Sequence, residues 1–261
     1  MKYKCLTIAG FDGSGGAGIQ ADLKTFSALG CYGMTVLTAL PVQNTCGVKR
    51  CYDIPSQCIY EQLITIFEDI TPDAIKIGML SNSETIAIVA DVLSSLAKNI
   101  PLVLDPVMYA KNGASLLKAD AIYALKNRLI PLASIVTPNL PEAKQLIPNL
   151  NDKCAMAAAI LNLGCKTVLL KGGHESSANC DDLFLSKKEM RVLSTERIMT
   201  KNTHGTGCTL SSAIASNLAK GLSTIDACYA AKEYLTQAIR AVSVQSVGKG
   251  RGPVHHFHHW Y

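Results

Sequence analysis

Short, almost wholly apolar runs alternate with amphipathic stretches of helical length along this chain of 261 residues. Strands covered on both faces are apolar throughout, so these runs predict an α/β fold: a mostly parallel central sheet with helices on both faces. The expected strands are 5–9, 34–40, 74–78, 102–106, 134–138 and 167–171. The expected helices are 19–29, 56–70, 83–98, 119–129, 141–147, 153–163, 208–219 and 225–243. Three short runs, 181–185, 190–194 and 197–200, indicate a small antiparallel edge. No linker or repeat divides the chain, so 1–261 is expected to be one domain.

Charge and composition exclude several function classes. The net charge is +5, but no Lys/Arg block occurs and aromatic residues make up only 6%, so we expect no nucleic-acid partner. No apolar run approaches the roughly 20 residues of a spanning helix, and we expect no membrane partner. The apolar N-terminal stretch fits a first strand better than a signal peptide, and the ten cysteines are scattered without a C-x-x-C pair. We therefore expect a cytoplasmic protein with reduced thiols.

The unusual residues of the sequence gather where the expected strands end. In open α/β sheets, ligands bind at the carboxyl ends of the strands. Seven segments fall at those positions: 10–18, 43–44, 78–79, 105–108, 139–142, 171–174 and 202–208. They contain most of the glycine clusters, acids and polar strand ends, so we expect the functional site to lie along this edge.

The first of these segments is a glycine loop between a strand and a helix. Gly13, Gly15 and Gly18 match G-x-G-x-x-G, the dinucleotide fingerprint, which makes an NAD(P)-binding oxidoreductase one alternative. That fingerprint also needs an acid at the end of the second strand, and no Asp or Glu occurs between Asp22 and Asp53. A tight turn without a ligand is the other alternative, although five glycines in nine residues exceed what a turn needs. Such a loop suits a backbone that approaches a substrate closely.

The second glycine loop, Gly205-Thr206-Gly207-Cys208, precedes a helix rich in small residues. Backbone N–H groups and the positive end of the helix dipole converge there, which favours an anion. No G-x-x-x-x-G-K-[ST] occurs, so a Walker loop is excluded. An ordinary helix start is the alternative, but this loop is expected to face the same sheet edge as several acids.

Two acids and a lysine complete the expected site. Asp105 ends an apolar strand, Glu142 begins a helix after the fifth strand, and Lys171 ends the strand that follows. Together the two carboxylates can hold magnesium with the help of water ligands, as phosphoryl-transfer sites do. Lys171 either extends out of the sheet or reaches a phosphate. Glu142 also fits a common first-turn acid with no further role.

Cys208 is expected in the first turn of a helix, where its pKa should be lowered. It would then help activate a substrate hydroxyl or line the hole that holds a transferring phosphoryl group. A cysteine hydrolase with His204 as base is a further alternative, which the spacing alone does not support. The C-terminal segment carries four histidines, and we interpret it as a docked segment without a catalytic role.

Eight motifs occur in the order found in hydroxymethylpyrimidine/phosphomethylpyrimidine kinases, which belong to the ribokinase superfamily and act in thiamin synthesis. They begin T-I-A-G-x-D-x-S-G-G-A-G at Thr7 and continue as Q-N-T, K-I-G-M-L, D-P-V-M, T-P-N-L-P-E-A, K-G-G-H, T-H-G-T-G-C and G-P-V-H-H-F-H. The chain resembles this family over nearly its whole length. Phe11 and Pro41 depart from the usual small residues near the substrate, so a pyridoxal kinase activity is the nearest alternative within the superfamily.

The resemblance implies ATP and Mg²⁺ as cofactors, a homodimer, and a small aminopyrimidine alcohol and its phosphate as substrates. It implies a substrate pocket formed by Gly10, Ala17, Asp22, Gln43, Met79 and Val107. It implies that Lys171, Asn139 and Thr206 bind the nucleotide and that Asp105 and Glu142 bind the metal. Catalysis is assigned in the same way to Cys208, Gly205, Gly207 and Lys171.

Overall fold

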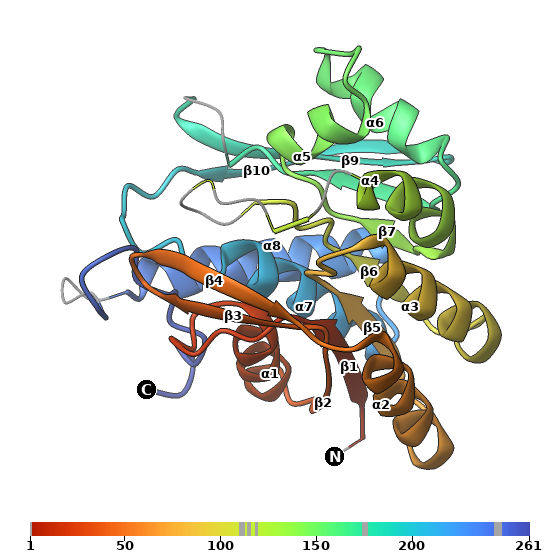
Figure 1. Ribbon diagram of the computed structural model, residues 1–261. Coiled ribbons are helices and arrows are strands. Elements are labelled where there is room, and N and C mark those ends of the chain that lie inside the picture. Colours follow the sequence, from red (N-terminus) through yellow and green to blue (C-terminus); the bar gives the residue numbers. More distant parts are fainter. Residues whose placement is uncertain (1, 110–112, 114–115, 118–119, 174–176, 243–246) are drawn as a thin grey trace.

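The computed structural model describes residues 2–109, 113, 116–117, 120–173, 177–242 and 247–261. Its largest element is an eight-stranded sheet with the order β10-β9-β8-β7-β6-β5-β1-β2 (Figure 1). The strands are β1 (Lys4–Ala9), β2 (Tyr32–Leu37), β5 (Ala74–Ile77), β6 (Leu102–Leu104), β7 (Ile135–Val136), β8 (Thr167–Leu170), β9 (Asn179–Ser186) and β10 (Met190–Glu196). Neighbours pair in parallel from β2 to β8, whereas β9 and β10 are antiparallel. The mostly parallel sheet with an antiparallel edge is therefore confirmed.

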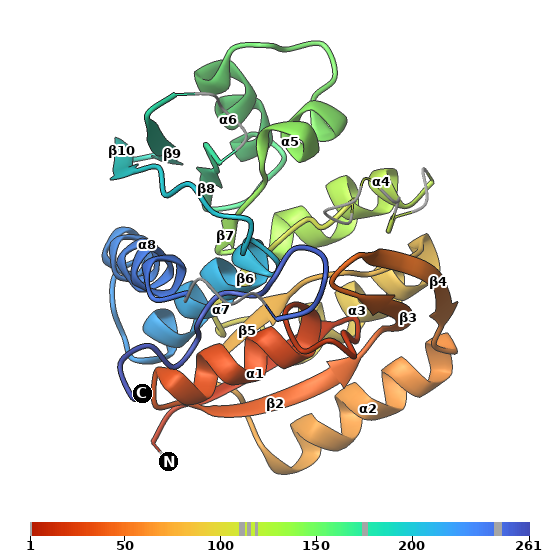
Figure 2. The same cartoon turned by 90° about the vertical axis from the view of Figure 1, so that its left-hand side faces the viewer.

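Alternate residues of each central strand enter two separate cores. In β1, Leu6 and Ile8 join one core while Cys5 joins the other. The first core is covered by α2 (Ser56–Asp69), α3 (Ser83–Leu96), α4 (Ala121–Ala124), α5 (Leu140–Leu146) and α6 (Lys153–Leu161). The second is covered by α1 (Gly18–Ala28), α7 (Thr206–Ala219) and α8 (Thr224–Arg240). Both faces of the sheet are thus covered by helices, as Figure 2 shows, which explains the apolar strands.

Helix α7 lies in the middle of the second layer, and all residues from Thr209 to Leu218 are buried. Its small side chains permit this burial, and several of its hydroxyls bond to the backbone of the helix and of its N-cap. Thr209 donates to the Gly205 carbonyl (2.9 Å), and Ser211 donates to the Gly207 carbonyl (2.9 Å). A helix so tightly enclosed fixes its N-terminus at the carboxyl edge of the sheet.

The expected strand 34–40 is in fact two strands, which is a correction to the sequence prediction. The chain leaves the sheet at Thr38, whose N–H donates to the Ala9 carbonyl and whose hydroxyl donates to the Met79 carbonyl. It continues as β3 (Ala39–Asn44), which pairs only with β4 (Gly47–Asp53) in a separate antiparallel hairpin. Strand β4 escaped prediction because its residues are mostly polar and exposed.

Two further expectations were wrong in detail. The run 197–200 is not a strand. The Arg197 guanidinium donates to the carbonyls of Gly172, Gly173, Ser177 and Asn179. The helix expected at 119–129 is divided into α4, a π-helical turn η1 (Leu125–Leu129) and a 3₁₀ turn η2 (Ile130–Leu132). Pro131 stands at the start of the last turn and cannot continue an α-helix.

Within the described residues, no helix combines the length and apolar character needed to cross a membrane.

Candidate active site

A cavity of about 720 Å³ opens at the carboxyl ends of the central strands. It is lined by every predicted site residue except Asp22: Gly10, Ala17, Gln43, Met79, Asp105, Val107, Asn139, Glu142, Lys171, Gly205, Thr206, Gly207 and Cys208. His174, part of the K-G-G-H motif, lies outside the described residues. Residues from seven separate segments of the sequence thus meet around one space.

One end of this cavity is charged and is formed by Asp105, Lys171 and the start of α7. The Lys171 Nζ donates to Asp105 Oδ1 at 2.8 Å, and the Thr137 hydroxyl donates to the same oxygen at 3.1 Å. Burial alone would lower the pKa of Lys171, but Asp105 and Glu142 outweigh it, so that this pKa lies above its usual value. A Cβ atom added to Gly207 would lie 3.3 Å from Asp105 Oδ2 and 3.5 Å from Lys171 Nζ. The N-terminus of α7 therefore faces a protonated lysine across a space that suits an anion.

Glu142 begins α5 in a reciprocal capping arrangement with Asn139. The Asn139 side chain accepts the Glu142 N–H at 2.9 Å, and Glu142 Oε2 accepts the Asn139 N–H at 2.8 Å. Burial raises the pKa of Glu142 to about 7; Lys171 opposes this rise and Asp105 adds to it. Glu142 is therefore a helix-capping acid that also lines the cavity beside Asp105 and Lys171.

The donor set fits a cation that is carried mainly by phosphate oxygens. Among the residues that the structure describes, no group of three or more His, Cys, Asp or Glu side chains can hold a metal. Asp105 and Glu142 are two carboxylates that line one cavity, and the charge of Asp105 contributes to the raised pKa of Glu142. A divalent cation would relieve that repulsion while taking its remaining ligands from phosphate and water.

Cys208 differs from its prediction. Desolvation by burial raises the pKa of this thiol to about 11, and the nearby Lys76 ammonium only partly offsets it. The helix-start position therefore does not produce a thiolate at neutral pH. His204 is not its base, because His204 Nε2 lies 2.7 Å from Asp12 Oδ2 and is committed to that carboxylate. The structure thus gives the cysteine-hydrolase alternative no nucleophile–base pair.

Asp22 is the one predicted substrate residue that the cavity lacks. It is fully buried and accepts hydrogen bonds from Thr7 (2.6 Å), Ser212 (2.6 Å) and Lys76 (2.8 and 3.0 Å). All its acceptor capacity is used, so it cannot contact a ligand in the cavity. Its partner Lys76 does reach the cavity wall and was missed by the sequence analysis. A lysine inside the apolar run 74–78 was the signal, since a buried lysine requires a partner.

The opposite end of the cavity is less charged. Gln43, at the end of β3, donates from Nε2 to the Phe11 carbonyl at 3.3 Å. Phe11, Pro41, Met79 and Val107 supply apolar surface around it. A flat polar ring would fit between such surfaces, with the Gln43 amide at its edge.

The first glycine loop is held together by hydrogen bonds between its own residues. The Asp12 carboxylate accepts the N–H groups of Ser14 (3.0 Å), Gly16 (3.1 Å) and Ala17 (2.7 Å). These amides are therefore not available to a dinucleotide pyrophosphate, which removes the main physical support for the NAD(P) alternative. The loop approaches the cavity through Gly10, Ala17 and Gly18 instead.

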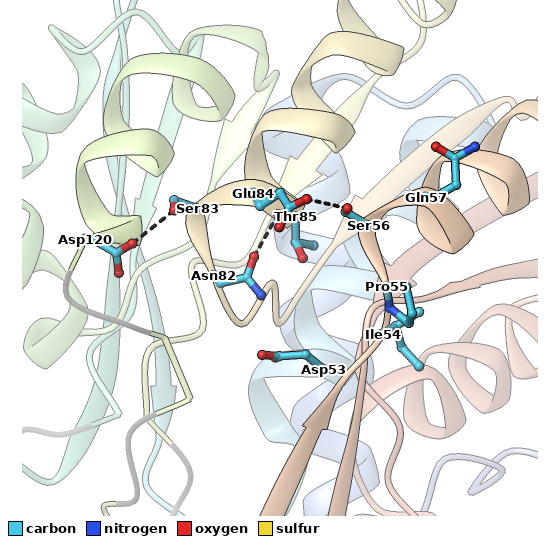
Figure 3. A pocket seen from close by; sticks show the side chains of 10 residues that line it. All are labelled: Asp53, Ile54, Pro55, Ser56, Gln57, Asn82, Ser83, Glu84, Thr85 and Asp120. Atoms are coloured by element: carbon cyan, nitrogen blue, oxygen red, sulfur yellow. Dashed lines mark hydrogen bonds between the residues drawn. The ribbon is translucent and has the colours of Figure 1, made fainter.

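A second hollow of about 540 Å³ lies between the starts of α2 and α3 (Figure 3). Two of its acids accept hydrogen bonds from neighbouring hydroxyls: the Ser56 hydroxyl donates to Glu84, and the Ser83 hydroxyl donates to Asp120. None of the predicted site residues lines this hollow. The chemistry of the molecule is therefore concentrated in the larger cavity.

Comparison with known proteins identifies the family. The model of the phosphomethylpyrimidine kinase family matches residues 12–255. A hydroxymethylpyrimidine/phosphomethylpyrimidine kinase from Rhizobium meliloti is 49% identical over 266 residues, which cover 100% of this chain and 99% of that protein. A solved phosphomethylpyrimidine kinase from Clostridium difficile has a TM-score of 0.80 and 45% identity, covering 91% of this chain and 100% of the other.

A pyridoxal kinase from Staphylococcus aureus, solved with AMP-PCP and pyridoxal, has a TM-score of 0.89 and 34% identity, covering 100% of this chain and 95% of the other. These relatives share one enzyme class, phosphoryl transfer from a nucleotide. The match of the family model and the full-length identity show that this chain belongs to the phosphomethylpyrimidine kinase family.

Proposed function

We propose that the chain uses ATP to phosphorylate 4-amino-5-hydroxymethyl-2-methylpyrimidine and then its monophosphate, in thiamin biosynthesis. One observation carries the proposal: the N-terminus of α7 faces Lys171 and Asp105 in the same cavity that Gln43 borders. An anion end and a ring-binding end in one cavity are what transfer of a phosphoryl group to a heterocyclic alcohol requires.

The phosphate end assigns distinct tasks to its residues. Lys171 and the backbone of Gly205, Thr206 and Gly207 would hold the phosphates of ATP, with Asn139 beside them. Fixed donors of this kind stabilise charge on the transferring group without reorganisation. Asp105 and Glu142 would hold magnesium. When bound there, the cation would neutralise charge on the phosphate oxygens.

Cys208 would border the transferring group as a neutral thiol. With a pKa of about 11, this thiol is protonated at neutral pH and is not a general base. Phosphoryl transfer proceeds through a loose transition state that places little demand on a base, so positioning is the contribution expected of this residue. The substrate end would place the aminopyrimidine between Met79 and Val107, with its polar edge at Gln43.

Phosphorylation of pyridoxal is a second candidate activity. Phe11 and Pro41 line the cavity and form part of its apolar wall, where the resemblance to pyrimidine kinases implies smaller residues. The similar pyridoxal kinase was solved with pyridoxal bound. The higher identity to pyrimidine kinases favours the pyrimidine as the main substrate.

We further propose a cytoplasmic homodimer. The β3–β4 hairpin exposes Leu40 (38%), Val42 (47%) and Tyr52 (51%), which a second copy would cover. The structure describes all ten cysteines and joins none of them in a disulfide, as suits a reducing compartment.

Mass spectrometry of the products tests the main proposal. The protein is incubated with the hydroxymethylpyrimidine, ATP and Mg²⁺, and in parallel with pyridoxal. We expect the monophosphate and then the diphosphate of the pyrimidine, with slower conversion of pyridoxal. Calorimetric titration with NAD and with ATP·Mg²⁺ supplies the control. Tight NAD binding without ATP binding, or phosphorylation of pyridoxal alone, would contradict the proposal.

A further inference from the structure

Asp12 organises the first glycine loop from inside. Its side chain is fully buried and accepts hydrogen bonds from the backbone N–H groups of Ser14, Gly16 and Ala17. The backbone N–H of Asp12 donates to Gln20 Oε1 at 2.8 Å. The loop shape that places Gly10 and Ala17 at the cavity therefore depends on this one carboxylate. Sequence analysis assigned Asp12 no role.

His204 connects this carboxylate to the second glycine loop. Its Nε2 lies 2.7 Å from Asp12 Oδ2, and its side chain is 14% exposed. Burial alone would raise the pKa of Asp12, but the hydrogen bonds from His204 and Ser14 outweigh it and hold this pKa well below its usual range. An ionised carboxylate only accepts, so His204 Nε2 carries the proton and donates. His204 directly precedes Gly205, the N-cap residue of α7.

The two loops also touch through their backbones. Gly205 has φ = 74°, and a Cβ atom added there would lie 1.8 Å from the Gly16 carbonyl oxygen. A Cβ atom added to Gly16 would lie 2.4 Å from His204 Cδ2. Neither loop can move far without displacing the other, so the glycines and the hydrogen bond between His204 and Asp12 act on the same contact.

The histidine-rich C-terminal segment supports this contact from behind. The His204 N–H donates to the Gly252 carbonyl at 3.0 Å, and His204 forms a parallel bridge with Pro253. Further along, His256 Nε2 lies 3.1 Å from the Thr209 hydroxyl on the first turns of α7. The segment thus has a structural task, which is to hold the second loop against the first.

We propose that His204 and Asp12 are positioning residues that lock the two glycine loops into one unit, fixing the acceptor substrate relative to the phosphoryl group. The inference rests on the proposed kinase function. One loop borders the substrate and the other borders the phosphates, so a small displacement between them separates the reacting atoms. Misplacement by about 1 Å costs roughly 100-fold in rate even when binding persists.

The test compares His204→Gln with His204→Asn in the full chain. The Gln amide nitrogen stands as many bonds from the backbone as His Nε2 and can donate to Asp12, whereas the Asn amide is one bond too short. We expect His204→Gln to retain most of the turnover. We expect His204→Asn to lose roughly 100-fold in kcat while the KM for ATP changes by less than about 3-fold. Melting curves accompany both variants, because a merely structural role would lower the melting temperature and leave kcat of the folded enzyme unchanged.

Should His204→Asn fail to fold, His204→Leu fills a similar volume without the hydrogen bond and takes its place. Wild-type kcat in the folded Asn or Leu variant would overturn the inference. Equal loss of kcat in the Gln variant would overturn it as well, because the role would then not depend on the Nε2 donor. If the wild-type chain itself fails to phosphorylate the pyrimidine, the proposed function is wrong, and this result is distinct from either of the others.

Discussion

The two glycine loops of the active site precede helices in similar ways, yet their environments differ. In the first loop, the N–H groups of Gly16 and Ala17 are bonded to Asp12. In the second, the start of α7 at Gly207 lies close to Lys171 and Asp105, and all three line the cavity. A glycine-rich helix start is therefore an anion site only where no nearby carboxylate has taken its amides and a cation stands opposite. The first loop forms a wall of the cavity, and we infer that the second binds the phosphates.

Removal of the cation opposite the second loop should have the largest effect. Lys171→Met should lower kcat/KM for phosphoryl transfer by about 10²- to 10³-fold, the usual cost of losing a donor to a developing charge. Steady-state kinetics measure this change, and a melting curve checks the fold, since Asp105 loses its partner. Lys166→Met is the matched control, because this exposed lysine stands just before the same strand. Comparable rates in both variants would remove Lys171 from the phosphate site.

At the other end of the cavity, Gln43→Ala should separate the substrate from the nucleotide. We expect KM for the pyrimidine to rise roughly 5- to 150-fold, because loss of one hydrogen bond to a buried ring edge costs about 1–3 kcal/mol. KM for ATP should stay near the wild-type value. Lys49→Ala, an exposed position on the neighbouring strand β4, should change neither constant. An unchanged substrate KM in Gln43→Ala would place the ring elsewhere.

Glu142 predicts a pH dependence of stability. A carboxyl group whose pKa is higher in the folded state binds more protons there, so the free energy of unfolding falls as the pH rises from about 4.5 to about 7. The full change is on the order of 3 kcal/mol. Glu142→Gln should lack this fall, whereas Glu84→Gln, an exposed first-turn acid of α3, should keep it. Urea unfolding between pH 5 and 8 measures the difference.

The dependence of the reaction rate on free Mg²⁺ provides a second test of Glu142. If Glu142 helps to hold the metal, Glu142→Gln should also weaken the dependence of the rate on free Mg²⁺. An unchanged Mg²⁺ response together with a small loss of stability would leave Glu142 as a helix-capping acid only.

The smallest expected effect concerns the contact between the loops. Gly16→Ala should lower the melting temperature by several degrees, because the new methyl group would overlap the His204 ring and overpacking costs about 1–3 kcal/mol. Gly13→Ala, in the same loop, meets only the outer edge of the Phe11 ring at 3.2 Å, which can turn away. A similar melting temperature for both variants would show that the loops are not in tight contact.

The central sheet could be predicted from the sequence because its middle strands are buried on both faces and are therefore short runs of apolar residues. The prediction failed where the chain leaves that sheet: the split at Thr38 depends on bonds to Ala9 and Met79, which are distant in sequence. The polar strand β4 pairs only with β3 and carries no apolar pattern.

For the site, the positions at strand ends predicted which residues meet around the cavity. The state of each group did not follow from position. Burial raises the pKa of the Cys208 thiol. The Asp22 carboxylate accepts hydrogen bonds from Lys76, Thr7 and Ser212. Asp12 is hydrogen-bonded to His204, which lies almost two hundred residues later in the chain. These pairings arise when α1 and α7 pack against each other and against β1 and β5, which no local pattern contains.

The difference between the two loops can be measured directly by NMR, from backbone amide shifts during titration with AMP-PCP and Mg²⁺. The account predicts large shifts for the amides of Gly207 and Cys208 and small shifts for those of Gly16 and Ala17, which remain bonded to Asp12. Titration with Mg²⁺ alone provides the control for the cation. Large shifts at Gly16 and Ala17 with none at Gly207 and Cys208 would contradict the account, since the first loop would then be the phosphate site.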